Sequence, residues 1–164
     1  MKRFLVITSL LLAMLLLLSA CQEKGKEGEE KGTEYAFQSG ETVIRIDAEA
    51  KAILDALGTC RAYSESPSCA FEGMDKVYTY NGFEVETYCL GDVDYIASVQ
   101  LLDDSVKTRE GISIGDTAEQ VMEAYGEATE SSTNALIYRA QGVTLQFLLR
   151  DGKVTNIQYL KNES

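Results

Sequence analysis

The side chains that most often perform chemistry in proteins are scarce in this sequence of 164 residues. It contains no His, the residue that most often acts as a general base near neutral pH and as a metal ligand. It also lacks the Gly-Lys-Thr of a phosphate-binding loop and the His-Glu-x-x-His of a zinc protease. We therefore expect a protein that is not an enzyme and that holds no cofactor and no metal.

Two pairs of carboxylates are the remaining candidates for chemistry. Asp92 and Asp94 form one pair, and Asp103 and Asp104 form the other. Carboxylate oxygens can bind Ca²⁺ or exchange protons, but neither spacing matches a calcium-binding loop. Both pairs lie where strands are predicted to end, and Asp at such positions favours turns because it bonds to its own backbone. The sequence therefore predicts turns at both places.

The first twenty residues have the pattern of a secretory signal peptide. Lys2 and Arg3 precede an apolar run over residues 10–18, and small residues follow it. The whole apolar stretch, residues 4–20, is short for a helix that spans a membrane, and no stop-transfer charges follow it. A cleaved signal is therefore favoured over a membrane-spanning anchor.

The residues at the end of this segment, Leu18-Ser19-Ala20-Cys21, resemble the lipobox of bacterial lipoproteins. The resemblance implies that Cys21 is lipidated, becomes the first residue of the mature chain and is held at a membrane by its acyl chains. It further implies a location on the extracytoplasmic face of the cell membrane, or in the outer membrane if the source has one. Gln22 stands where an Asp would signal retention in the inner membrane.

Residues 21–40 are predicted to form a flexible charged tether. Lys, Glu and Gly dominate this segment, and its few apolar side chains cannot offset the entropy cost of ordering it. Acidic residues dominate the whole chain as well, with 26 against 15 basic ones and a formal charge of -11. This excess argues against a nucleic-acid partner, because phosphate binding depends on clustered Lys and Arg.

A pattern in the remaining chain, residues 41–164, recurs after 68 residues. Apolar residues and a Gly at positions 44, 46, 50, 53, 54, 57 and 58 recur at positions 112, 114, 118, 121, 122, 125 and 126. In each copy the spacing predicts a short amphipathic helix that ends at the Gly. Asp47 is the predicted cap of the first helix, and Thr117 with Gln120 forms a predicted capping box for the second.

Three strands are predicted after each helix. Asn81-Gly82 and Gln141-Gly142 each separate two alternating segments, as in a hairpin, and a third strand follows at residues 95–102 and 154–160. We therefore predict an α+β fold of two tandem units, residues 41–105 and 106–164. Each unit has one helix and a three-stranded antiparallel sheet, and the helices pack on one sheet face.

Alternation along these strands predicts which side chains face away from the helices. Such a polar face is ordinary for a solvated antiparallel sheet, but it is also the broadest candidate surface for a partner. This face, together with two aromatic residues from the connection after the first helix, supplies the candidate binding residues Tyr63, Phe71, Thr79, Glu84, Glu86, Tyr88, Arg139 and Gln146.

The tandem arrangement and residues 111–126 resemble the repeat of the beta-lactamase inhibitory protein. After Gly111 the segment reads Ile-Ser-Ile-Gly-Asp-Thr-Ala-Glu-Gln-Val, and it closes with Tyr-Gly. It also resembles the small lipoprotein of the outer-membrane barrel-assembly machine. The resemblance implies a module that binds another protein and performs no chemistry. Asp47-Ala48 replaces the usual Gly near the first helix, and no residue matches the lactamase-contacting loops of the inhibitor.

Three cysteines remain if Cys21 is lipidated, which predicts one disulfide and one free thiol. The resembling inhibitor pairs a Cys that shortly follows its helix with one before the next strand. This implies a bridge between Cys60 and Cys69, with Cys69–Cys89 and Cys60–Cys89 as alternatives.

We expect a membrane-anchored lipoprotein that binds another envelope or extracellular protein through its sheet face and loops. The alternative is a lipoprotein that captures a small molecule or glycan on aromatic side chains such as Tyr63 and Tyr88.

Overall fold

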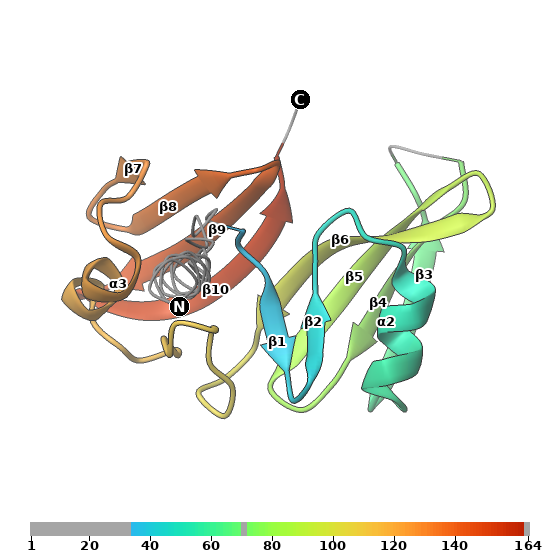
Figure 1. The fold of residues 1–164 in the computed structure, drawn as a ribbon, viewed down its shortest axis with the longest axis horizontal. Helices are drawn as coiled ribbons and strands as arrows, with labels where there is room; N and C mark the ends of the chain where they lie inside the picture. The colour runs from blue at the N-terminus through green and yellow to red at the C-terminus, as the bar shows by residue number, and fades with distance from the viewer. Residues whose placement is uncertain (1–33, 70–71, 163–164) are drawn as a thin grey trace, which may run out of the picture. The chain divides into compact units, whose positions relative to one another are not determined.

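Two β-sheets and two helices make up residues 34–69 and 72–162, the part of the chain that the computed structural model describes. Figure 1 shows both helices on the same side of the larger sheet. The elements, in chain order, are β1 (Phe37–Ser39), β2 (Thr42–Ile44), α2 (Ala50–Leu57), β3 (Ala62–Pro67), β4 (Met74–Thr79), β5 (Phe83–Leu90), β6 (Val93–Leu101), α3 (Ala118–Tyr125), β7 (Glu130–Ser131), β8 (Ala135–Ala140), β9 (Val143–Arg150) and β10 (Lys153–Lys161).

The larger sheet consists of two four-stranded meanders that join at one seam. Its strand order is β3-β4-β5-β6-β10-β9-β8-β7, and every neighbouring pair is antiparallel. The seam is the pairing of β6 with β10, which runs from Ser98 opposite Leu160 to Leu101 opposite Ile157. The two halves of the chain therefore share one continuous sheet.

The predicted fold class is wrong. The described structure is mostly β, each helix is followed by four strands, and the eight strands form one sheet instead of two three-stranded ones. Of the strands that follow the helices, β3 is the longest one that the sequence did not predict, and all six of its residues are exposed. Its sequence, Ala-Tyr-Ser-Glu-Ser-Pro, shows no apolar alternation, so pairing with β4 rather than local propensity extends it.

The two helices occupy the two apolar stripes of the sequence, but they begin differently. The Thr117 hydroxyl accepts a hydrogen bond from the backbone N–H of Gln120, whose side chain accepts one from the Thr117 backbone, so the capping box of α3 is confirmed. α2 begins after Glu49 with no side-chain cap, and the predicted cap at Asp47 is wrong. Asp47 has a φ of 66°, and its carboxylate bonds to Tyr88 instead.

The strands β1 and β2 contribute to the core on the helix side of the seam. Phe37 in β1 is 1% exposed, and its ring centroid lies 4.9 Å from that of Phe83 on β5 and 6.1 Å from that of Tyr159 on β10. One buried ring therefore contacts both halves of the sheet. The sequence predicts a tether up to residue 40, but residues 35–37 are buried in the core, so the folded part begins earlier.

The signal at residues 1–20, the lipidation of Cys21 and most of the tether lie outside the described residues. Within residues 34–69 and 72–162, no helix has the length and apolar character needed to cross a membrane.

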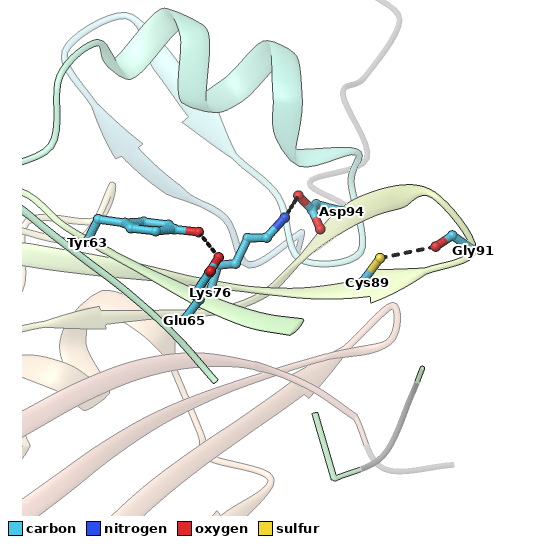
Figure 2. Close-up of polar contacts among 6 residues, drawn as sticks. All are labelled: Tyr63, Glu65, Lys76, Cys89, Gly91 and Asp94. Carbon is cyan, nitrogen blue, oxygen red and sulfur yellow. Dashed lines mark hydrogen bonds and ion pairs between the residues drawn. The ribbon is translucent and has the colours of Figure 1, made fainter. Parts of the chain in front are cut away.

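Cys60, Cys69 and Cys89 are all free thiols. The predicted bridge between Cys60 and Cys69 is not formed, because these residues lie beyond opposite ends of β3. A strand of six residues spans about 20 Å, whereas a disulfide needs Cα atoms within about 7 Å of each other. Cys89 is half-buried on β5, and its thiol donates to the carbonyl oxygen of Gly91 at 3.2 Å (Figure 2).

Candidate functional site

A row of polar side chains crosses the seam on the sheet face that points away from the helices. Glu84 pairs with Gln100, Gln100 with Gln158, and Gln158 with Gln146. The neighbours of these residues along each strand are buried in the core, so alternation turns this row to the opposite face. The Gln158 amide donates to the Gln100 side-chain oxygen at 2.6 Å. This hydrogen bond joins the two halves on their polar face.

A second row runs parallel to the first and also crosses the seam. Glu86 pairs with Ser98, Ser98 with Leu160, Leu160 with Thr144, and Thr144 with Arg139. The Ser98 hydroxyl donates to the Glu86 carboxylate at 3.1 Å. Glu86 and Arg139 stand at the two ends of this row, four strand spacings or about 19 Å apart.

The second row lines an open cavity of about 790 Å³. Side chains on the solvated face of a sheet are usually exposed, yet Glu86, Ser98 and Gln146 are only half-exposed and Thr144 is buried. The polar face is therefore hollowed along the seam. The cavity is lined by Ser68, Asp75, Glu86, Tyr88, Ala97, Ser98, Ile137, Arg139, Thr144, Gln146, Leu160, Lys161 and Asn162.

Charges of opposite sign come from opposite halves of this cavity. Asp75 and Glu86 belong to the first half, and Arg139 and Lys161 belong to the second. Arg139 also forms an exposed ion pair with Glu130. A partner that carries both signs of charge would find complementary groups across the seam.

Three side chains form a hydrogen-bonded cluster at one end of the cavity. The Tyr88 hydroxyl donates to Asp47 Oδ1 at 2.7 Å, and Lys161 Nζ donates to the Tyr88 hydroxyl at 3.2 Å and lies 2.9 Å from Asp47 Oδ1. Lys161 also sits 4.9 Å from the centroid of the Tyr88 ring, which stacks against Tyr95. Tyr88 is consequently only 8% exposed.

The pKa shifts of the three side chains keep Asp47 and Lys161 charged and Tyr88 neutral. Burial raises the pKa of the Tyr88 phenol, and its hydrogen bond to Asp47 raises it further. Burial alone would raise the pKa of Asp47, but the hydrogen bonds from Tyr88 and Lys161 outweigh it and lower that pKa. The hydrogen bond to Asp47 raises the pKa of Lys161. These shifts stabilise an ion pair beside a neutral phenol and provide no group poised to exchange protons near neutral pH.

Half of the predicted binding residues meet in the cavity, namely Glu86, Tyr88, Arg139 and Gln146. Thr79 and Glu84 pair with each other on the same sheet face, but they do not line the cavity. Tyr63 lies on the other face, where its ring packs 5.1 Å from that of Tyr78. Phe71 lies outside the described residues.

Several residues that line the cavity are not among the predicted binding residues. Ile137 lies between the buried residues Leu136 and Tyr138, so strand alternation could have placed it on the polar face. No sequence signal marks Lys161, because its contacts with Asp47 and Tyr88 join distant segments.

Neither acidic pair forms a site. Asp94 makes an ion pair with Lys76 at 2.6 Å (Figure 2), and Asp103 accepts a hydrogen bond from the backbone N–H of Ser105 at 2.9 Å, as in a turn. No group of three His, Cys, Asp or Glu side chains in the described part of the chain could hold a metal ion.

One serine has the sequence spacing of an esterase nucleophile. Residues 111–115 read Gly-Ile-Ser-Ile-Gly, a pattern that in α/β-hydrolases exposes the serine on a strand-to-helix turn. Here Ser113 is only 6% exposed. Its backbone N–H and its hydroxyl both donate to the Asp116 carboxylate, at 2.8 and 3.3 Å. The motif therefore shapes the loop before α3, and Ser113 does not line the cavity.

No protein-family model, curated protein or solved structure matches the chain.

Proposed function

We propose that this chain is a membrane-anchored extracytoplasmic lipoprotein that binds another envelope or extracellular protein in the cavity on its sheet face. The observation that carries the proposal is the row that crosses the seam along the cavity and ends in charges of opposite sign, Glu86 and Arg139. Pockets for small molecules enclose most of their ligand, whereas this cavity is open to solvent. An open hollow with charges of opposite sign on its two sides suits a protein surface, because electrostatic complementarity selects and orients protein partners.

The contacts of the aromatic side chains count against capture of a glycan. Stacking on a sugar needs an accessible ring face, but the Tyr88 ring already contacts Lys161 and Tyr95 and is 8% exposed. Tyr63 is 49% exposed but lies on the face away from the cavity. Neither of the two aromatic residues expected to hold a glycan is therefore placed to do so in this cavity.

The anchor in this proposal is the acyl group on Cys21. The chain carries a formal charge of -11, so anionic lipid headgroups would repel its surface and the acyl chains must hold it at the membrane. In cells that express the full chain, Cys21→Ser should abolish labelling by radioactive palmitate and move the protein out of the membrane fraction. Labelling that survives this substitution would contradict the proposed anchor.

Photo-crosslinking from inside the cavity tests the binding role. A photoreactive phenylalanine analogue replaces Gln146 in the full chain, expressed in its native cells. The matched control carries the same analogue at Glu123, which is exposed on α3 and does not line the cavity. We expect a discrete covalent product from position 146 and none from position 123.

Charge reversal distinguishes specific binding from chance contact. Arg139→Glu and Glu86→Arg, each made in the Gln146 photoprobe chain, should lower the yield of that product at least about tenfold, because each places a like charge opposite the partner. A product that forms equally from positions 146 and 123, or that is indifferent to both reversals, would refute binding in the cavity.

A further inference from the structure

The strand β3 forms one edge of the sheet, and within it only Pro67, its last residue, lacks a backbone N–H. Among the described strands it pairs with β4 alone, and all six of its residues are exposed. The opposite edge strand, β7, has only two residues. An edge strand presents unpaired N–H and C=O groups, and proteins usually keep such strands short or cover them because they template pairing with another chain. The β3 edge is thus the place where this sheet can be extended.

We propose that β3 pairs antiparallel with β3 of a second copy of this chain, about a two-fold axis that passes beside Tyr63. In this register Arg61 lies opposite Glu65 of the second copy, and Glu65 lies opposite Arg61 of the second copy. The two Tyr63 side chains lie directly opposite each other at the centre. Opposite charges and aromatic pairs at directly opposed positions stabilise antiparallel strands.

The register is specific because Arg61, directly before β3, and Glu65, within it, are the one basic and the one acidic residue of this segment. A shift by one residue in either direction separates both Arg61–Glu65 pairs and turns the side chains to the other face. Within the described residues, neither Arg61 nor Glu65 belongs to an ion pair closer than 4 Å. Figure 2 shows Glu65 accepting the hydrogen bond from the Tyr63 hydroxyl of its own strand.

The symmetry of this pairing suits two chains anchored in one membrane. A two-fold axis perpendicular to the sheet keeps the helix faces of both copies on one side and both cavities on the other. The described chain enters on the helix side, where Tyr35 packs against Tyr125 and Tyr138. The first described residues of both copies would therefore lie on the same side of the joined sheet. Confinement to a membrane raises the effective concentration of the copies, which favours an interface as small as one strand.

This inference goes beyond the proposed function, since Arg61, Tyr63 and Glu65, which make the contact between the copies, do not line the cavity. Its test uses the full chain in membranes, with Cys60, Cys69 and Cys89 replaced by Ser. Tyr63→Cys in this background places one thiol beside the axis, where directly opposed Cα atoms are about 5 Å apart. Treatment with diamide, which takes up the two electrons and two protons that the thiols lose, should give a disulfide-linked dimer. Ser66→Cys is the matched control, because its two copies would be about 20 Å apart and should stay monomeric.

Charge reversal then tests the register. Arg61→Glu or Glu65→Arg alone, added to the Tyr63→Cys chain, should lower the dimer yield about tenfold, because two attractive pairs become repulsive. The double variant should restore it. All three residues are exposed, and circular dichroism of each variant verifies that the fold is kept.

Equal crosslinking from Tyr63→Cys and Ser66→Cys, no response to single reversal, or no recovery in the double variant would overturn the proposal. A product with the mass of a different protein would assign the edge to another partner and would also overturn it. Arg139→Glu should leave the dimer yield unchanged, so failure of the cavity proposal and failure of this one can be distinguished.

Discussion

The two halves of the sheet have matching helices and matching contacts between helix and sheet, but their outer strands differ in length. Each half begins with an eight-residue helix that ends at a Gly of nearly the same conformation, Gly58 with φ 75° and Gly126 with φ 79°. In each, the residue before the helix bridges to the start of the last strand, Glu49 to Tyr95 and Thr117 to Lys153. The outer strands, however, have six residues in β3 and two in β7.

This contrast separates the positions that maintain the fold from those free to serve binding. Core positions must repeat because both halves pack helices on the same sheet face, and a change there leaves a cavity or an overlap. Edge strands and helix caps carry no such constraint. The greater length of β3 compared with β7 is therefore a feature of the first half that the shared core does not require.

Removing the ring that joins the halves should have the largest effect. Phe37 is 1% exposed and touches Phe83 in the first half and Tyr159 in the second, so Phe37→Ala should cost about 3–5 kcal/mol of unfolding free energy. Urea unfolding followed by circular dichroism measures this loss. If the halves act as one sheet, the variant should still unfold in a single transition. Two separate transitions would show that the halves are independent.

The two helix starts should respond differently to the same substitution. Thr117→Ala removes the hydroxyl that accepts from the Gln120 backbone N–H, one of the two hydrogen bonds of the capping box, and should cost about 1 kcal/mol. Glu49→Ala, at the corresponding position of α2, removes no side-chain cap and should change stability by less than about 0.5 kcal/mol. The same urea titration compares them. Equal losses in the two variants would mean that the cap is not what distinguishes the helices.

The smallest effect should come from the ion pair between Asp47, shortly before α2, and Lys161 at the end of β10. The pKa of Asp47 is lowered in the folded protein, so its carboxylate adds stability above its unfolded pKa, near 3.8, and loses this contribution as the pH falls through the folded value. The pair is about half-exposed, which limits its strength. Asp47→Asn should therefore reduce the drop in urea midpoint between pH 6 and pH 3.

Removal of the partner provides the control for that pH dependence. Lys161→Met should flatten the same pH profile, because Asp47 then loses both its ion pair and one hydrogen bond. The second half has Gly115 at the position that corresponds to Asp47, so no matching pair exists there. Parallel pH profiles for the wild type and both variants would rule out a contribution from this pair.

Sequence patterns predict the parts of this fold that depend on local chemistry. The two apolar stripes, the Thr117–Gln120 capping box and the turn residues Asn81-Gly82 lie where the structure has α2, α3 and the β4–β5 connection. These features depend on residues close together in the chain, so spacing is informative.

The rest of the fold depends on partners that are distant in sequence. Four of the six residues of β3 are Ser, Glu and Pro, and the segment becomes a strand beside β4. Residues 34–39 look like the end of a charged tether, yet Phe37 becomes part of the core when β5 and β10 surround it. The seam itself pairs Gln100 with Gln158, a contact that no local pattern indicates.

The candidate site divides in the same way. Alternation identifies Glu86, Tyr88, Arg139 and Gln146 as residues of the polar face. It cannot indicate that they line one hollow, because that depends on how the seam joins the halves. The predicted Cys60–Cys69 bridge failed for a related reason, since a strand extends between residues that a loop would have brought together.

The position of β10 has a consequence for how the chain must fold. The last described strand, β10, lies in the middle of the sheet, between β6 and β9, so the first half cannot complete its pairing until β10 has been made. Until then β6 remains an open edge, and such late, long-range pairing slows folding and exposes the chain to aggregation. Loss of residues 153–161 through a premature stop codon would therefore remove the centre of the sheet, and both halves would lose their fold together.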